Sequence, residues 1–339
     1  MRFWYVGGAW ASKSAQQRIR EIEPEKVESI AIIRHAALGD MVLTRPFIHE
    51  CRKFFPNAKI TLSLVSNYTR GAPTDMVDRV HIAIGSDQRH VSKRQQLKVA
   101  KELGHHDLIF DLAATSRSFW ITKLNSATLK LGFPYHAFQK YLFYDVTIPR
   151  SDMRFEAEAM TDLLNVLGHK TSMPLVFDLP GSIYKSERDY IVYFTSASTQ
   201  YKCWPDDHFI DLIDELSSQY SDMDHFVLEG VSGDESVQNI LSHFKYQKNV
   251  SAKQINDIDE TIAFIRGASL VVSNDTGIRH LAIAGGVPSV GLFSVVDGYG
   301  TAPFRYWPRF DRHEIAINPD GSWPDVESVK GLAIKLLPK

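Results

Sequence analysis

The chain has 339 residues, which is long enough for two domains because a single hydrophobic core rarely grows beyond about 250–300 residues. Its 44% hydrophobic and 23% charged residues are typical of a globular protein, and a net charge of −2 argues against nucleic acid as the main partner. Two cysteines, Cys51 and Cys203, exclude a disulfide scaffold and fit a reducing compartment.

The N-terminal segment, residues 1–28, precedes the first clear strand pattern. Its apolar start is short, carries one charge at Arg2 and is interrupted by glycines, so it does not fit a signal peptide. The longest apolar stretch, residues 281–296, contains Pro288 and is too short to cross a bilayer. We therefore expect a cytoplasmic protein with an N-terminal extension and no transmembrane segment.

Strand and helix patterns alternate along the first half of the chain. Short apolar runs predict strands, and longer amphipathic runs between them predict helices. The strands are expected at 29–36, 59–66 and 107–113, and the helices at 41–55, 93–104 and 154–168. This alternation predicts a parallel sheet covered by helices, in a domain over residues 29–170.

The second half repeats this pattern after an irregular linker at residues 171–188. Strands are expected at 189–198, 225–230, 268–272 and 288–294, in a domain over residues 189–322 that is followed by a closing helix at 323–339. The fold class is therefore α/β, with two doubly wound Rossmann-like domains facing each other across a cleft. In such sheets, ligands bind beyond the carboxyl ends of the strands.

Charged residues follow the first strand, in the segment RHAALGDMVLTRP. Asp40 stands at the strand-to-helix turn, where a carboxylate either caps the helix or acts as a general base. Arg34 and His35 stand at the end of the strand, where they can hold an anionic substrate. This segment is the candidate site of the first domain.

The segment TSASTQYKCWPDDHF follows the first strand of the second domain. Ser196 and the hydroxyl residues next to it supply hydrogen-bond donors, and Lys202 supplies a positive charge. Trp204-Pro205 gives the next helix a rigid start. The segment is typical of a phosphate site, and a solvated loop with an incidental lysine is the alternative interpretation.

A third segment, SNDTGIRHLAIAGGVP at residues 273–288, predicts a tight turn into a helix after the strand ASLVV. Gly277 allows a sharp turn or a close approach to a ligand. A helix that begins here directs free backbone N–H groups and its positive dipole end at the space above the sheet. This favours a phosphate site, and a capped turn without a ligand is the alternative.

Taken together, these segments resemble the ADP-heptose–lipopolysaccharide heptosyltransferases of glycosyltransferase family nine, over about residues 29–293. The resemblance rests on the order and spacing of IAIIRHAALGDMVLTRPF, LIFDLAATSRS, LGFP, SASTQYKCWPDDHFIDLI and SNDTGIRHLAIAGGVPSVGLF. The D-T-G-x-x-H block is its most specific part.

The resemblance implies a GT-B fold and an inverting, metal-independent glycosyltransferase. The donor would be ADP-heptose or a similar nucleotide sugar, and the acceptor a lipopolysaccharide-core-like glycolipid at the inner membrane surface. No cofactor is implied beyond the nucleotide sugar itself. The expected location is the cytoplasm or the inner face of the cytoplasmic membrane.

The resemblance also assigns roles to individual residues. By position, Asp40 matches the catalytic base, and Arg34 and Arg117 lie on the acceptor side together with His35. The donor-binding set is Ser196, Lys202, Asp275, Thr276, Gly277 and His280. Two departures from the family pattern are Ile278, which replaces a proline after D-T-G, and Ala113-Ala114, which replaces glutamine-glycine after D-L.

Other functions fit part of this pattern. The nearest alternative keeps the fold but uses another nucleotide sugar and a capsule, other glycan or protein acceptor. An alternative of another class is a nucleotide-sugar-binding regulator without turnover, against which Asp40 argues. A dehydrogenase is disfavoured because no G-x-G-x-x-G follows a predicted strand. The polar clusters at 105–107 and 222–224 lack further ligands at suitable spacing, so no metal site is expected.

Overall fold

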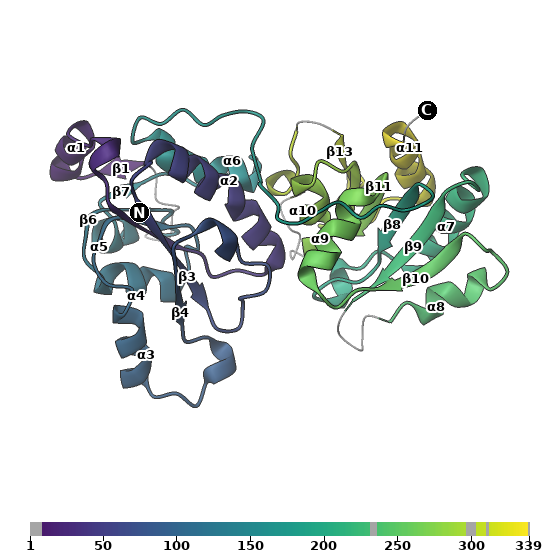
Figure 1. Ribbon diagram of the computed structural model, residues 1–339, viewed down its shortest axis with the longest axis horizontal. Helices are drawn as coiled ribbons and strands as arrows, with labels where there is room; N and C mark the ends of the chain where they lie inside the picture. The colour runs from purple at the N-terminus through teal and green to yellow at the C-terminus, as the bar shows by residue number, and fades with distance from the viewer. Residues whose placement is uncertain (1–8, 231–235, 296–302, 310–311, 338–339) are drawn as a thin grey trace. The chain divides into compact units, whose positions relative to one another are not determined.

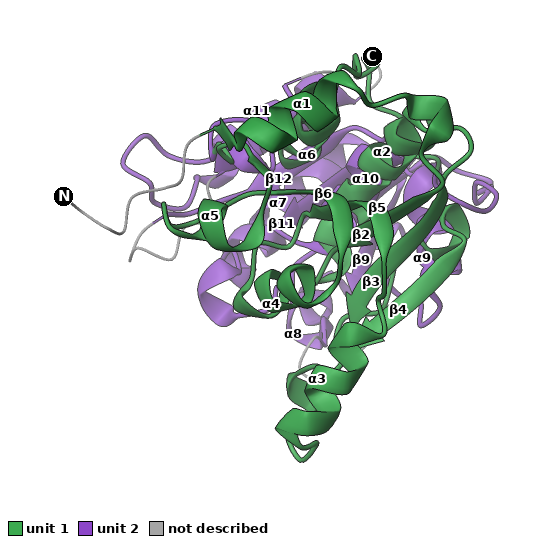
Figure 2. Ribbon diagram, turned by 90° about the vertical axis from the view of Figure 1, so that its left-hand side faces the viewer, with its two compact units in different colours: residues 1–151, 156–178 green, residues 152–155, 179–339 purple. Residues whose placement is uncertain are grey.

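Two parallel β-sheets organise the chain, one in each of two units (Figure 1). The computed structural model describes residues 9–230, 236–295, 303–309 and 312–337. Unit 1 consists of residues 1–151 and 156–178, and unit 2 consists of residues 152–155 and 179–339 (Figure 2). Helices cover both faces of each sheet, so the expected pair of doubly wound α/β units is confirmed.

The described part of unit 1 contains a sheet with the strand order β1-β7-β6-β5-β2-β3-β4. Its strands are β1 (Trp10–Ala11), β2 (Ser29–Ile33), β3 (Lys59–Val65), β4 (Arg79–Ala83), β5 (His106–Asp111), β6 (Ala127–Gly132) and β7 (Val146–Thr147). All neighbours are parallel except β1 and β7. The interior strand β2 is apolar from Ile30 to Ile33, where both of its faces are buried.

The helices of unit 1 divide between the two faces of this sheet. They are α1 (Lys13–Arg20), α2 (Leu38–Phe54), α3 (Lys93–Lys101), α4 (Ser116–Leu124), α5 (Gln139–Phe143) and α6 (Glu156–Asn165). Helices α2 and α6 pack together on one face, and α4 packs between α3 and α5 on the other (Figure 2). Within the described residues, no helix has the length and apolar character needed to cross a bilayer.

Unit 2 contains a fully parallel sheet with the order β10-β9-β8-β11-β12-β13 in its described residues. Its strands are β8 (Tyr190–Phe194), β9 (Asp224–Glu229), β10 (Val250–Gln254), β11 (Leu270–Asn274), β12 (Ser289–Leu292) and β13 (His313–Ala316). Its helices are α7 (Asp206–Gln219), α8 (Gln238–Leu241), α9 (Ile258–Gly267), α10 (Gly277–Ala284) and α11 (Val326–Leu336). Helix α11 packs against α7, and α9 packs against α10.

Two elements differ from their expected positions. Strand β11 continues to Asn274 instead of ending at residue 272, because Ser273 pairs with Phe194 and Asn274 pairs with Leu292 in the parallel ladder. Strand β1 lies in the N-terminal extension and pairs with β7, so this segment completes the edge of the unit 1 sheet. Sequence patterns missed β1 because a two-residue strand has no detectable periodicity.

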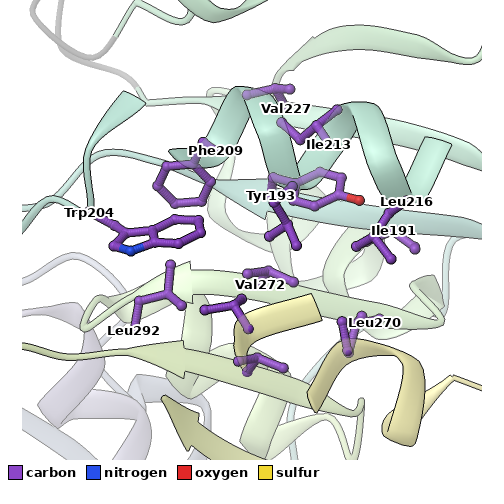
Figure 3. Packing of buried hydrophobic residues seen from close by; sticks show 14 of the residues in the cluster. Ile191, Tyr193, Trp204, Phe209, Ile213, Leu216, Val227, Leu270, Val272 and Leu292 are labelled. Carbon is purple, nitrogen blue, oxygen red and sulfur yellow. The ribbon is translucent and has the colours of Figure 1, made fainter. Parts of the chain in front are cut away.

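Trp204 connects the core of unit 2 to the carboxyl edge of its sheet. Its indole ring is fully buried against Phe209 at a centroid distance of 4.9 Å (Figure 3). The Trp204 backbone N–H donates to the Asn274 side-chain oxygen at 3.0 Å, and the Asn274 amide donates to the Thr195 carbonyl at 2.6 Å. One buried carboxamide therefore joins the end of β11 to both ends of the loop that follows β8.

We predict that Asn274→Ala lowers the free energy of unfolding by about 2–5 kcal/mol, because it leaves two buried backbone groups without partners at about 1–3 kcal/mol each. Urea denaturation measures this change. The control is Asn57→Ala, which removes one hydrogen bond from an exposed amide to the Glu25 carbonyl and should cost about 0.5–1 kcal/mol. Equal losses in the two variants would show that Asn274 is not a structural connection.

Candidate functional site

The predicted site residues lie where the strand order of each sheet reverses. In unit 1 this reversal falls between β2 and β5, and in unit 2 it falls between β8 and β11. Loops diverge at such a point, so the carboxyl ends of the two strands border a natural ligand site. All predicted site residues follow one of these four strands.

Asp40 lies in the first turn of α2, which follows β2. The N-cap of this helix is Ala37, so Asp40 does not take the capping position. Its carboxylate accepts a hydrogen bond from Arg34 Nη2 at 2.9 Å, and 30% of the side chain is exposed. This geometry leaves the carboxylate oriented by a cation and open to a ligand.

Arg34 is almost completely buried, with 2% exposure, and its two terminal nitrogens donate hydrogen bonds to protein groups. Besides Asp40, it donates to the Leu112 carbonyl at 2.6 Å and to Glu156 Oε1 at 3.3 Å. Glu156 is fully buried and is also paired with Arg150. These contacts suit a residue that orients Asp40, and the expected role of Arg34 in holding an anionic substrate stays a prediction.

His35 is buried beside the same strand end. Burial lowers the pKa of His35 to about 3, and the nearby charges of Arg117 and His81 act in the same direction. The imidazole is therefore neutral at pH 7. Neither ring nitrogen has a hydrogen-bond partner among the described residues. Arg117 is exposed, in the first turn of α4.

A buried carboxylate shapes the turn that leads into α4. Asp111 accepts hydrogen bonds from the backbone N–H groups of Ala113 and Ala114, each at 3.0 Å, and from the hydroxyls of Ser118 and Tyr144. Ala114 has a φ of 51°, which is costly for a residue with a Cβ. The four hydrogen bonds to Asp111 hold this conformation at one of the two departures from the family pattern.

In unit 2, the structure brings together three of the predicted donor residues. Lys202 Nζ lies 3.9 Å from one carboxylate oxygen of Asp275, and His280 Nε2 lies 4.0 Å from the other. Lys202 comes from the loop after β8, whereas Asp275 and His280 flank the start of α10. We call this group the Lys202–Asp275–His280 cluster. It lies at the switch point of the unit 2 sheet.

The amino end of α10 borders this cluster. Thr276 is its N-cap but gives no side-chain cap, and its hydroxyl instead lies 3.0 Å from the Ser273 hydroxyl. Gly277 is the first helical residue and has no left-handed φ, so the turn itself does not require glycine. Ser196 lies half-buried after β8 and makes no hydrogen bond with the cluster among the described residues.

Sequence patterns missed Arg279, which belongs to the first turn of the same helix. It is fully buried, donates to the Tyr306 carbonyl at 2.7 Å, and stacks over the Phe293 ring. Burial lowers the pKa of Arg279 to about 10, and the charge of Asp275 opposes this shift. A Cβ at position 291 would lie 2.1 Å from Arg279 Nε, so Gly291 makes room for the guanidinium. The sequence signal that could have identified Arg279 is a charged residue within an apolar helix.

The polar clusters at 105–107 and 222–224, for which no metal site is expected, contact other protein groups. His105 contacts Ser126, His106 contacts Thr61, and Asp107 binds the backbone near Ser29. In the second cluster, Asp224 begins β9 and pairs with Arg188. Among the described residues, no group of three His, Cys, Asp or Glu side chains is arranged to hold a metal ion.

Solved structures define the class of protein to which this fold belongs. E. coli heptosyltransferase WaaC with ADP is 18% identical, covering 91% of this chain and 99% of that chain, with a TM-score of 0.72. A family 9 glycosyltransferase from Veillonella parvula DSM 2008 is 19% identical, covering 93% and 98%, with a TM-score of 0.70. E. coli ADP-heptose lps heptosyltransferase II is 16% identical, covering 91% and 99%, with a TM-score of 0.65. The fold is that of the GT-B glycosyltransferases.

The sequence model of glycosyltransferase family 9 (heptosyltransferase) matches residues 96–306. The chain therefore belongs to this family and is a glycosyltransferase, as the motifs predicted. A search of curated proteins gives no match to this sequence.

The neutral state of His35 predicts a pH dependence of stability. Because the folded pKa lies near 3 and the unfolded pKa near 6.5, the unfolded chain binds a proton that the folded chain excludes between these values. Stability is therefore lost as pH falls below about 6.5, with a slope from His35 of up to about 1.4 kcal/mol per pH unit.

We expect His35→Gln to remove this part of the slope. Urea denaturation of wild type and variant between pH 7 and pH 4 measures the difference, which isolates His35 from the other histidines. Parallel pH profiles would mean that the folded protein protonates His35 as readily as the unfolded chain.

Proposed function

We propose that this glycosyltransferase moves a heptose, or a similar sugar, from an ADP-sugar donor to a lipopolysaccharide inner-core-like glycolipid, with inversion. The family description names heptosyltransferases, and two structures of the E. coli enzyme WaaC are titled with ADP and with ADP-2-deoxy-2-fluoro heptose. In this chain, the observation that carries the proposal is the Lys202–Asp275–His280 cluster at the uncapped amino end of α10.

The amino end of α10 is suited to a diphosphate. Its first backbone N–H groups have no side-chain cap, and its dipole is positive at this end. Lys202, whose side chain is a quarter exposed, adds a positive charge. Arg279, a buried residue of α10, adds a second one. Since the turn does not require a glycine at position 277, we propose that Gly277 lets a phosphate approach the backbone closely. Together these groups stabilise the charge that develops on the departing diphosphate.

Asp40 is suited to take the proton from the acceptor hydroxyl. Its carboxylate is partly exposed, while Arg34 holds it from the buried side. As the acceptor oxygen attacks the anomeric carbon from the side opposite the diphosphate, a single displacement inverts that carbon. His35 can donate one hydrogen bond and accept another, which fits a neutral sugar hydroxyl, and exposed Arg117 fits an anionic group of the acceptor.

In this proposal, neither a metal nor a cofactor takes part beyond the nucleotide sugar, because Lys202, Arg279 and the helix dipole supply positive charge at the leaving group. The acceptor places the enzyme peripherally at the inner membrane surface. Mass spectrometry of products from a panel of nucleotide sugars tests the donor. Transfer from a sugar linked to another nucleotide, and not from ADP-heptose, would support the alternative donor, and turnover of none would support a regulator.

We predict that Asp40→Asn lowers kcat by about 10²–10⁴-fold because it removes the proton acceptor, while donor affinity stays near that of the wild type. Steady-state kinetics with the donor identified above, together with calorimetry for ADP, measure both quantities.

Asp75→Asn is the matched control for this variant. Asp75 also pairs with a buried arginine of unit 1, Arg45, at 2.6 Å, but it lies outside the switch point. Its amide variant should therefore keep wild-type kcat. Comparable turnover of the two variants would reduce Asp40 to a structural partner of Arg34.

We predict that Lys202→Ala weakens ADP binding by about 10–100-fold, because a hydrogen bond to a charged group contributes about 1.5–3 kcal/mol. Calorimetry with ADP measures this change. Lys330→Ala is the control, since Lys330 has a similar exposure of 23% and is paired with Glu215 and Glu327 on a different surface of unit 2. Unchanged ADP affinity in Lys202→Ala would exclude Lys202 from the donor site.

A further inference from the structure

Large apolar side chains are exposed together on one part of unit 1. Trp120 belongs to α4, Tyr135 and Phe138 to the loop after β6, and Tyr141 and Leu142 to α5. Each of these five side chains is at least 41% exposed, and Tyr141 reaches 65%. We call these five residues the aromatic patch. Exposed apolar groups that gather in this way mark an interaction site more often than single exposed residues do.

The aromatic patch rests on buried rings that hold it in place. Helices α4 and α5 pack together (Figure 2), with Phe119 stacked on Phe143 at 5.2 Å. The ring of Trp120 meets Phe143 edge-on at 5.7 Å, and Tyr141 meets Trp10 of β1 at 5.0 Å. Two of the exposed rings, Trp120 and Tyr141, are therefore held by neighbouring aromatic rings.

The segment that carries the aromatic patch is basic and contains no acidic residue. Between Asp111 and Asp145 the sequence has neither Asp nor Glu, although the chain's 40 acidic residues would give about four in a segment of this length. It has four cations, namely Arg117, Lys123, Lys130 and Lys140. Lys140 lies over the Tyr141 ring at 5.1 Å, and Lys123 is exposed at the end of α4. The surface therefore combines aromatic rings with positive charge.

The aromatic patch continues from the acceptor edge of the sheet. Strands β2, β5 and β6 are parallel, so the residues that follow them leave from one edge. Asp40 follows β2, Arg117 opens α4 after β5, and Tyr135 follows β6. Arg117, in the first turn of α4, also helps to lower the pKa of His35, which follows β2.

We propose that the aromatic patch docks unit 1 onto an anionic lipid bilayer. Trp and Tyr rings have an apolar body and a polar tip, which suits the interface between headgroups and acyl chains, and lysines bind anionic headgroups. A protein partner fits less well, because lysine is depleted in protein interfaces. The purpose of this docking rests on the proposed glycolipid acceptor, whose sugar would then lie at the edge that holds Asp40.

The test is co-sedimentation of the full chain with vesicles of phosphatidylcholine alone and of phosphatidylcholine with phosphatidylglycerol. The wild type should bind the anionic vesicles at least tenfold more tightly, and less tightly at high salt. Trp120→Ser/Tyr141→Ser and Lys123→Glu/Lys140→Glu should each weaken this binding at least tenfold. Circular dichroism verifies that both variants are folded.

The matched control is Lys245→Glu/Tyr246→Ser in unit 2, where Tyr246 is 97% exposed and follows a lysine. It should bind vesicles like the wild type. The proposal is overturned if the wild type does not bind anionic vesicles, if the folded patch variants bind like the wild type, or if the control loses binding equally. Light scattering that shows a dimer lost in Trp120→Ser/Tyr141→Ser would also overturn it, because a second copy would then occupy the patch.

Turnover of a water-soluble, deacylated acceptor separates this proposal from the proposed function. The patch variants should retain wild-type turnover of that acceptor, because none of the four substituted residues is assigned to catalysis or to substrate binding. Vesicle binding does not depend on turnover. An enzyme that binds vesicles without transferring the sugar would refute the proposed function alone, and one that transfers without binding would refute the patch alone.

Discussion

The direction of the strands is the constraint on which the candidate site of each unit depends. In a parallel sheet every strand ends at the same edge, so each strand delivers the residues after it to one place. Where the strand order reverses, the loops separate and leave room for a ligand. In unit 1 this constraint brings Asp40 and Arg117 to one edge, although 77 residues separate them in the sequence. In unit 2 it brings Lys202 to Asp275 in the same way.

The residues at these edges divide into groups satisfied by protein and groups left open. The terminal nitrogens of Arg34, the carboxamide of Asn274 and the carboxylate of Asp111 are buried, and they bind backbone or side-chain groups that fix neighbouring segments. By contrast, His35 has two ring nitrogens without a partner among the described residues. Burying a polar group without a hydrogen bond costs free energy. The open nitrogens of His35 therefore suit the sugar hydroxyl that we propose for them.

The sequence could predict this architecture because strand runs and their turns are local signals. The alternation of apolar runs, and the positions of Asp40, Lys202 and the D-T-G-x-x-H block after strands, needed no tertiary information. Tertiary contacts decide the remainder. The position of Arg34 in the sequence predicts a substrate-binding cation. Only the fold shows that its guanidinium also donates to Glu156, which is 122 residues away. The sequence likewise predicts a turn at Asn274. Only the fold shows that Asn274 pairs with Leu292 in the sheet and accepts a hydrogen bond from the Trp204 backbone.

Packing limits the positive charge that faces Asp40, the proposed base. A cation beside a carboxylate stabilises its ionised form and weakens it as a proton acceptor, so a general base benefits from few cations. Arg34 divides its charge between Asp40 and Glu156, and Glu156 is held in turn by Arg150. Burial keeps His35 neutral, so the histidine five residues before Asp40 adds no second cation. Arg117, the cation that we propose for an anionic acceptor group, lies instead on the exposed first turn of α4.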